Sequence, residues 1–175
     1  MYKRQAIEIP QQIRTKINSL QNKLKKEFHN VKWVEEKNLH LTLKFLGEID
    51  EIEPIVRTIK KILAQIAGFE ASLAGLGGFP QNNRARVIWI GVNMGETILA
   101  KLMEDLDREL VACGIPAESR KKVPHLTIGR VRRGFIKLPD YEFESDRFPV
   151  KELVLFKSTL TPQGPIYEPL KKFSL

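Results

Sequence analysis

Two of the three histidines in this 175-residue chain open the same short pattern, His-Leu-Thr followed by an aliphatic residue. His40 begins HLTLKFLG at residues 40–47, and His125 lies in PHLTIGR at residues 124–130. Threonine occupies only seven positions in the chain, so a threonine two places after both histidines is not expected by chance. The repetition indicates that the two motifs share a task.

Each motif predicts a β-strand that presents one imidazole and one hydroxyl on the same face. Side chains at positions i and i+2 of a strand point the same way. His40 therefore shares a face with Thr42, and His125 shares a face with Thr127, while the aliphatic residues of both motifs point into the core. If the two strands face each other, a cleft between them holds two imidazoles and two hydroxyls.

A pair of histidines is suited to acid-base chemistry, because a neutral ring can take a proton while a charged ring gives one. Two hydroxyls can hold the nonbridging oxygens of a phosphoryl group. The set fits attack of water on a strained cyclic phosphodiester, whose leaving oxygen needs only a proton.

Two other interpretations stay open from the residues alone. The histidines could be a buried structural pair, each ring satisfied by a neighbour. A metal site is the least favoured, because zinc takes three or four ligands and neither motif has an Asp, Glu, Cys or second His on the same strand face. No metal or cofactor is therefore expected.

The residues after each motif histidine extend the candidate site. Lys44 lies four positions after His40 and is expected to face the cleft, as an RNA contact or as a solvated rim residue. Phe45 and Arg130 lie five positions after their histidines, so a flat strand would turn both away. A bulge at Gly129 would return Arg130 to the cleft. If the first strand ends early, Phe45 would also turn towards the cleft; the alternative for Phe45 is packing in the core. Trp89 is interpreted as a core residue.

Composition predicts one globular domain over residues 1–175 with an anionic partner. Hydrophobic residues make up 42% of the chain, and the formal net charge is +8. Arginines and lysines cluster around the second motif, in RKKVPHLTIGRVRR at residues 120–133.

The N-terminal residues have no apolar run typical of a signal peptide, and no stretch approaches the length of a membrane span. We expect a cytoplasmic protein, by default a monomer, and no intrachain disulfide, since Cys113 is the single cysteine.

Hydrophobic periodicity predicts three helices among several strands. The helices are expected at residues 13–28, 54–66 and 95–113, and the strands at 5–9, 31–34, 40–47, 69–76, 87–92, 125–130, 150–160 and 166–175. GGFP at residues 77–80 and TPQGP at 161–165 are expected to be turns. Each half contains a helix that ends about twelve residues before its motif. The fold class predicted is α+β: a bilobal, pseudo-two-fold molecule of two antiparallel sheets with helices outside and the two motifs in a central cleft.

The two motifs, in a chain of this length, resemble the two-histidine phosphoesterase superfamily, specifically its RNA 2′,3′-cyclic phosphodiesterase branch, also called 2′-5′ RNA ligases. Four further features agree with that branch: Arg4, ARVIWIGV at 85–92, Arg130 at the end of the second motif, and STLTPQGPIYEPL at 158–170. The resemblance spans nearly the whole chain.

The resemblance implies hydrolysis of an RNA-terminal 2′,3′-cyclic phosphate to a 2′-phosphate. It implies that His40 is the proton donor to O3′ and His125 the proton acceptor that activates water. Thr42, Thr127 and Arg130 would then bind the phosphate. Phe45 is similar to an aromatic residue that contacts a base, and Tyr167 is a candidate cleft residue.

Two alternative functions remain possible on sequence grounds. One is a noncatalytic RNA-end-binding module that keeps the fold and the basic cleft. The other is 2′-5′ ligation, in which an RNA 5′-hydroxyl takes the place of water. A tRNA half, another RNA fragment and a small cyclic nucleotide would all offer the same phosphate.

Overall fold

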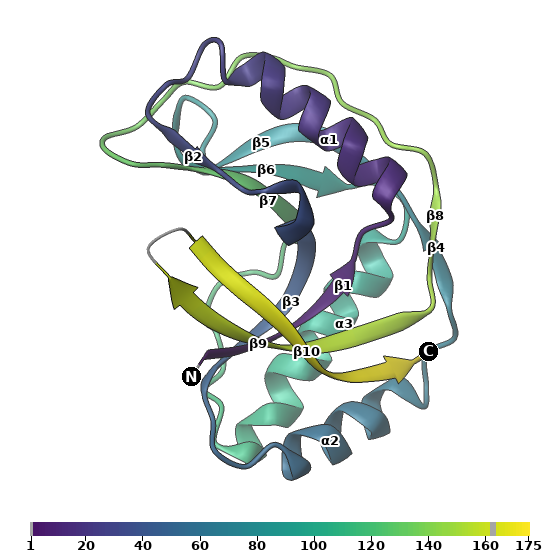
Figure 1. The fold of residues 1–175 in the computed structure, drawn as a ribbon. Helices are drawn as coiled ribbons and strands as arrows, with labels where there is room; N and C mark the ends of the chain where they lie inside the picture. The colour runs from purple at the N-terminus through teal and green to yellow at the C-terminus, as the bar shows by residue number, and fades with distance from the viewer. Residues whose placement is uncertain (1, 162–163) are drawn as a thin grey trace.

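The computed structural model describes residues 2–161 and 164–175 and has an α+β fold, as predicted (Figure 1). The helices are α1 (Gln11–Leu24), α2 (Glu53–Leu63) and α3 (Glu96–Glu109), with short 3-10 helices η1 (Glu36–Asn38) and η2 (Leu110–Cys113). The strands are β1 (Tyr2–Glu8), β2 (Val31–Trp33), β3 (His40–Glu48), β4 (Phe69–Ala71), β5 (Leu73–Gln81), β6 (Arg84–Val92), β7 (His125–Val131), β8 (Phe148–Val150), β9 (Glu152–Thr161) and β10 (Gly164–Ser174).

Two four-stranded antiparallel sheets divide the two motifs between them. The first, here called sheet A, has the order β10-β9-β1-β3 and carries His40 at the start of β3. The second, sheet B, has the order β2-β7-β6-β5 and carries His125 at the start of β7. Strands β3 and β7 contact each other, so the two histidine-bearing strands meet where the sheets meet.

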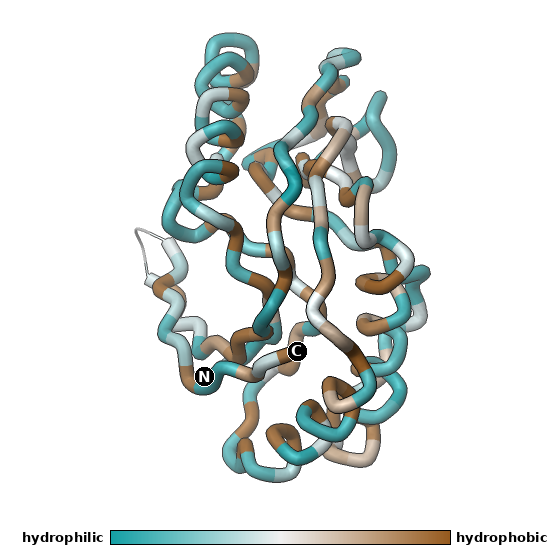
Figure 2. Tube along the Cα trace, turned by 90° about the vertical axis from the view of Figure 1, so that its right-hand side faces the viewer, coloured by the Kyte–Doolittle hydropathy of each residue, from teal (hydrophilic) through white to brown (hydrophobic). Residues whose placement is uncertain are grey.

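Helices cover the outer faces of both sheets. Helix α1 packs on sheet B with its buried side, on which the Gln21 amide donates hydrogen bonds to the carbonyls of Val34 and Ile128. In Figure 2 the hydrophobic segments of α1 lie along the side that faces the strands. Helices α2 and α3 pack together on the side of sheet A, against β10 and β3 respectively. This packing leaves the inner faces of the sheets to the motif side chains.

Some element boundaries differ from those predicted. GGFP is not a turn: residues 77–80 continue β5, because Gly77 leaves room for the Trp89 ring, which a Cβ there would approach to 2.3 Å. The same hairpin extends β6 back to Arg84, three residues before the strand start predicted at residue 87. Helix α1 ends at Leu24 rather than near Phe28. Of the predicted turn TPQGP, Pro162 and Gln163 lie outside the described residues.

A β-bulge at the same position of each motif reverses the alternation of side chains. On β3, Thr42 pairs with Ala6 and Lys44 with Gln5, so Leu43 is the extra residue. On β7, Thr127 pairs with Trp89 and Gly129 with Ile88, so Ile128 is the extra residue. Burial accordingly follows the same order at residues 40–45 and 125–130, with the fifth residue after each histidine exposed and the fourth buried. The bulges therefore decide which flanking residues join the histidines.

No helix within residues 2–161 and 164–175 is both long and apolar enough to cross a membrane.

Candidate active site

Both motif histidines are held by the same hydrogen bond. Nδ1 of His40 lies 2.7 Å from the carbonyl oxygen of Asn38, and Nδ1 of His125 lies 2.7 Å from the carbonyl oxygen of Val123. A carbonyl oxygen only accepts, so Nδ1 carries the hydrogen in each ring. The neutral rings therefore keep a lone pair on Nε2, the atom that is left to exchange protons.

His40 lies among one cation and two aromatic rings of sheet A. Nη1 of Arg4 lies 3.3 Å from its Nε2, and the ring of Tyr167 stands edge-on at 4.8 Å between centroids. The Phe156 ring lies 6.2 Å away. Burial and, to a smaller extent, the charge on Arg4 lower the pKa of His40 to about 4 against the opposing hydrogen bond to Asn38. His40 is therefore neutral at pH 7 in the free protein.

His125 has a similar surrounding built from sheet B. The Phe79 ring stands edge-on to it at 4.9 Å, and the Trp89 ring lies at 6.1 Å. Burial lowers the pKa of His125, the hydrogen bond to Val123 opposes this, and the charge on Arg130 lowers it further. The interpretation of Trp89 as a core residue is wrong: the ring is only half-buried and packs beside the histidine, because β6 turns it to the face that carries Thr127.

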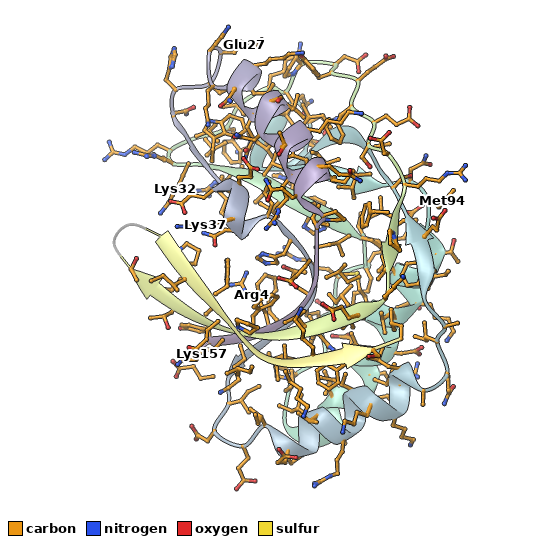
Figure 3. All side chains as sticks on the ribbon, turned by 45° about the vertical axis from the view of Figure 1, so that its right-hand side comes forward. Arg4, Glu27, Lys32, Lys37, Met94 and Lys157 are labelled. Carbon is orange, nitrogen blue, oxygen red and sulfur yellow. The ribbon has the colours of Figure 1, made fainter. Side chains whose placement is uncertain are left out.

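The residues around His40 and those around His125 influence one another electrostatically. Burial lowers the pKa of Arg4, and the charge on Arg130 of β7 lowers it further. Burial raises the pKa of Tyr167, and the charges on Arg4 and Arg130 oppose this rise. Arg4 and Tyr167 both belong to sheet A, so Arg130 acts across the two sheets. In Figure 3 Arg4 points into the space between the sheets, with Lys32 and Lys37 on one side and Lys157 on the other. Arg4, His40, His125, Arg130 and Tyr167 together are called the two-histidine site below.

The other residues named from the motifs lie on the same faces as the histidines, with one exception. Thr42 and Thr127 are half-buried, each two residues along the strand from its histidine. Phe45 is 52% exposed, with the Arg4 guanidinium 4.9 Å from its ring centre, and Arg130 is exposed on β7. The bulges at Leu43 and Ile128 turn both of these fifth residues inward to the site.

The exception is Lys44, and the expectation that it faces the cleft is wrong. The bulge turns Lys44 to the opposite side of sheet A, where it is 2% exposed. Its ammonium group lies 2.5 Å from Asp107 of α3, 3.0 Å from the carbonyl of Pro116 and 3.2 Å from Glu118. Lys44 therefore joins β3 to α3 and to the loop that leads into His125.

Asp107 is the centre of that buried network. Its carboxylate accepts hydrogen bonds from the backbone N–H of Glu118 at 3.0 and 3.1 Å and pairs with Lys122 at 3.1 Å. Burial raises its pKa, but the hydrogen bonds from Lys44, Glu118 and Lys122 outweigh this and lower the pKa overall. The network fixes residues 116–122, just before the second motif.

Sequence reasoning misses three contributors to the site. Phe79 falls in a predicted turn and Phe156 has no predicted role, yet both rings pack against a histidine. The carbonyl groups two residues before each histidine carry no side-chain signal.

The groups of the site are suited to acid-base chemistry and to anion binding. Each imidazole keeps the lone pair on Nε2, which in His40 accepts a hydrogen bond from Arg4, and Arg130 supplies a second positive charge. No group of three or more His, Cys, Asp or Glu side chains placed to hold a metal ion occurs in the described part of the chain.

Comparison with known proteins gives the same family along nearly the whole chain. The family model described as LigT like Phosphoesterase matches residues 7–89 and 92–167. The RNA 2′,3′-cyclic phosphodiesterase of Methanocaldococcus jannaschii is 40% identical over 96% of this chain and 97% of its own length. That of Methanothermobacter thermautotrophicus is 37% identical over 97% of this chain and 96% of its own length.

Solved structures agree with this result. The crystal structure of TT0787 of Thermus thermophilus superposes with a TM-score of 0.85 and 32% identity, over 100% of this chain and 98% of that one. E. coli LigT complexed with 3′-AMP superposes with a TM-score of 0.80 and 27% identity, over 99% and 97% of the two chains. The chain belongs to the LigT-like phosphoesterase family.

Proposed function

We propose that this protein hydrolyses the 2′,3′-cyclic phosphate at the 3′ end of an RNA to a 2′-phosphate, in the cytoplasm. One observation carries the proposal: two histidines from different sheets are held in the same tautomer, with the hydrogen on Nδ1 and the lone pair on Nε2, beside Arg4 and Arg130. The names of the relatives, RNA 2′,3′-cyclic phosphodiesterase, support the substrate class.

The reaction needs one proton acceptor and one proton donor. His125 takes a proton from water through Nε2, and the water oxygen attacks phosphorus. The bond between phosphorus and O3′ breaks, and the proton on Nε2 of His40 passes to O3′. The products are a 2′-phosphate and a free 3′-hydroxyl, so one water is consumed and the two rings exchange protonation states.

Substrate binding supplies the protonated ring. Both rings are neutral in the free protein because burial and two arginines disfavour a further positive charge. A bound phosphodiester brings a negative charge beside Arg4 and Arg130, and this charge raises the pKa of both histidines. His40 then carries its catalytic proton, while Thr42 and Thr127 donate hydrogen bonds to the nonbridging oxygens.

The test is incubation of a short labelled RNA ending in a 2′,3′-cyclic phosphate with the protein in chelator. We expect a 2′-phosphate product, with kcat lowered by about two to four orders of magnitude in His40→Ala and in His125→Ala. His29→Ala is the matched control, because His29 is exposed and lies outside both motifs. Full activity in either motif variant, or a 3′-phosphate product, would refute the proposal.

A sulfur leaving group separates the two histidine roles. A thiolate leaves without protonation, so a cyclic substrate with sulfur in place of O3′ bypasses the proton donor. His40→Ala should then recover turnover close to that of the unmodified protein, whereas His125→Ala should stay slow. Recovery in His125→Ala instead would reverse the assignment and leave the hydrolysis itself intact.

A further inference from the structure

A second group of cationic and aromatic side chains lies at the far end of β6. The Arg84 guanidinium lies 4.2 Å from the centre of the Phe135 ring, and the Arg86 guanidinium lies 5.5 Å from it. Both arginines are exposed, and Phe135 is 42% exposed. These three residues are called the β6 patch.

A bulge places the β6 patch on the face of sheet B that carries His125. Phe79 pairs with Val87 and Pro80 pairs with Ala85, so Arg86 is the extra residue. Ala85 points to the covered side, where it is fully buried against the backbone of Gly78. The arginines on either side of Ala85 therefore point to the other face, the one on which the Phe79 and Trp89 rings meet His125.

Strand β6 joins this patch to the two-histidine site. Gly91 pairs with His125, Trp89 with Thr127 and Val87 with Arg130, so the inner face of β6 runs from the second motif directly to Arg86. Arg86 lies five positions before Gly91, roughly 17 Å along the strand from the level of His125. Arg86 also precedes Val87, the partner of Arg130, so the patch begins where the two-histidine site ends and continues away from the histidines.

The positive charge of the patch is not neutralised by a carboxylate in the described part of the chain. Within the described residues, neither Arg84 nor Arg86 forms an ion pair with a carboxylate. Three exposed basic residues lie close to Phe135 in the sequence of the loop after β7, namely Arg132, Arg133 and Lys137. In Figure 1 this loop and the β5–β6 turn lie at the same end of sheet B. Converging cations beside an exposed ring favour an anionic partner that also has flat faces to stack.

We propose that the β6 patch binds the RNA strand that precedes the terminal cyclic phosphate. The cyclic phosphate is at a 3′ end, so all remaining nucleotides lie on its 5′ side and must leave the site along some surface. Phe135 stacks on a base, and Arg84 and Arg86 contact the phosphates next to it. The preferred substrate is therefore an RNA oligonucleotide rather than a nucleoside cyclic monophosphate. The inference rests on the proposed function.

The test compares two substrates, a nucleoside 2′,3′-cyclic monophosphate and an RNA oligonucleotide with the same end. We expect the double variant Arg84→Ala/Arg86→Ala to lower kcat/KM for the oligonucleotide at least tenfold, mainly through KM, and to leave the mononucleotide within twofold. Phe135→Ala should lower the oligonucleotide value several-fold. Lys60→Ala/Lys61→Ala, which removes the same charge from the exposed side of α2, is the matched control.

A binding measurement keeps the patch testable without turnover. Fluorescence anisotropy with an oligonucleotide that ends in a 3′-hydroxyl should show weaker binding by the arginine double variant than by the lysine control. Equal binding, or an equal loss of kcat/KM on both substrates, overturns the role of the patch while hydrolysis stands. Failure of the unmodified protein to hydrolyse either substrate overturns the proposed function instead.

Discussion

Each motif histidine receives its tautomer from the carbonyl two residues before it and its low pKa from burial and a nearby arginine. The two rings are therefore alike in the free protein, and neither is committed to acid or base by its own hydrogen bonds. The difference between them is the neighbour at Nε2: Arg4 lies 3.3 Å from this atom of His40. A phosphate that draws Arg4 to itself frees Nε2 of His40 for a proton.

The pH dependence of turnover follows from these pKa values. Hydrolysis needs one protonated and one neutral ring, and in the free protein the pKa of His40 is about 4 while that of His125 lies below its ordinary value. The singly protonated form is lost as pH rises through the higher pKa and as it falls through the lower one. We expect kcat/KM to peak below about pH 6.5.

Bound phosphate raises both pKa values, so the optimum of kcat should lie at higher pH than that of kcat/KM. Arg4→Gln removes one cause of the low His40 pKa, so the acid limb of its kcat/KM profile should move to higher pH. Stopped assays with the mononucleotide from pH 4 to 9 measure both effects. Identical flat profiles for kcat and kcat/KM would contradict the acid-base pair.

At the scale of elements, the two bulges do most of the positioning. Without them, strict alternation would place Lys44 and Gly129 beside the histidines and turn Phe45 and Arg130 away. Gly129 faces β2 instead, and a Cβ there would lie 2.8 Å from Val31, so the position takes no side chain without a shift. The equivalent residue of the first motif, Lys44, has the room to reach Asp107.

The buried Lys44 network should matter for both stability and turnover. Lys44→Met leaves the Asp107 carboxylate without its partner on β3, and loss of one member of a buried pair costs about 3 kcal/mol in the free energy of unfolding. The change also frees residues 116–122, which precede His125, so kcat should fall as well. Urea unfolding and steady-state kinetics measure the two effects.

Lys101→Met is the comparison for this prediction. Lys101 pairs with Asp105 on the exposed side of the same helix, with 74% of its side chain accessible, so its loss should cost less than about 1 kcal/mol. Equal stability of the two variants would show that the buried network contributes no more than a surface pair.

At the scale of the whole molecule, the net charge of +8 acts on encounter with RNA. We expect kcat/KM for an RNA oligonucleotide to fall steeply as the salt concentration rises. In a plot of log kcat/KM against log salt concentration, each phosphate contact should contribute about −0.7 to the slope. The mononucleotide carries a single phosphate and should show a much smaller slope, and kcat should change little. Assays between 50 and 400 mM salt test this, and equal slopes for both substrates would argue against an extended RNA contact.

The expectations of a single domain, a monomer and a cytoplasmic location stay predictions.

Sequence reasoning correctly predicted the α+β class, the three helices, the two histidine strands and the family, because these depend on local periodicity and on side-chain types at short spacing. The turn predicted at GGFP is wrong since local rules treat glycine pairs as turns, whereas Gly77 makes room for the ring of Trp89 from the next strand.

The directions in which the residues after each bulge point depend on long-range strand pairing and could not be predicted from local patterns. A bulge is defined by the register of the neighbouring strand, and Lys44, Phe45 and Arg130 were therefore undetermined until β1 and β6 were paired with the motifs. The neutral state of both histidines was likewise undetermined, because burial and the arginine charges come from residues far away in the chain. Local patterns select the chemical groups, and long-range pairing sets their direction and their charge.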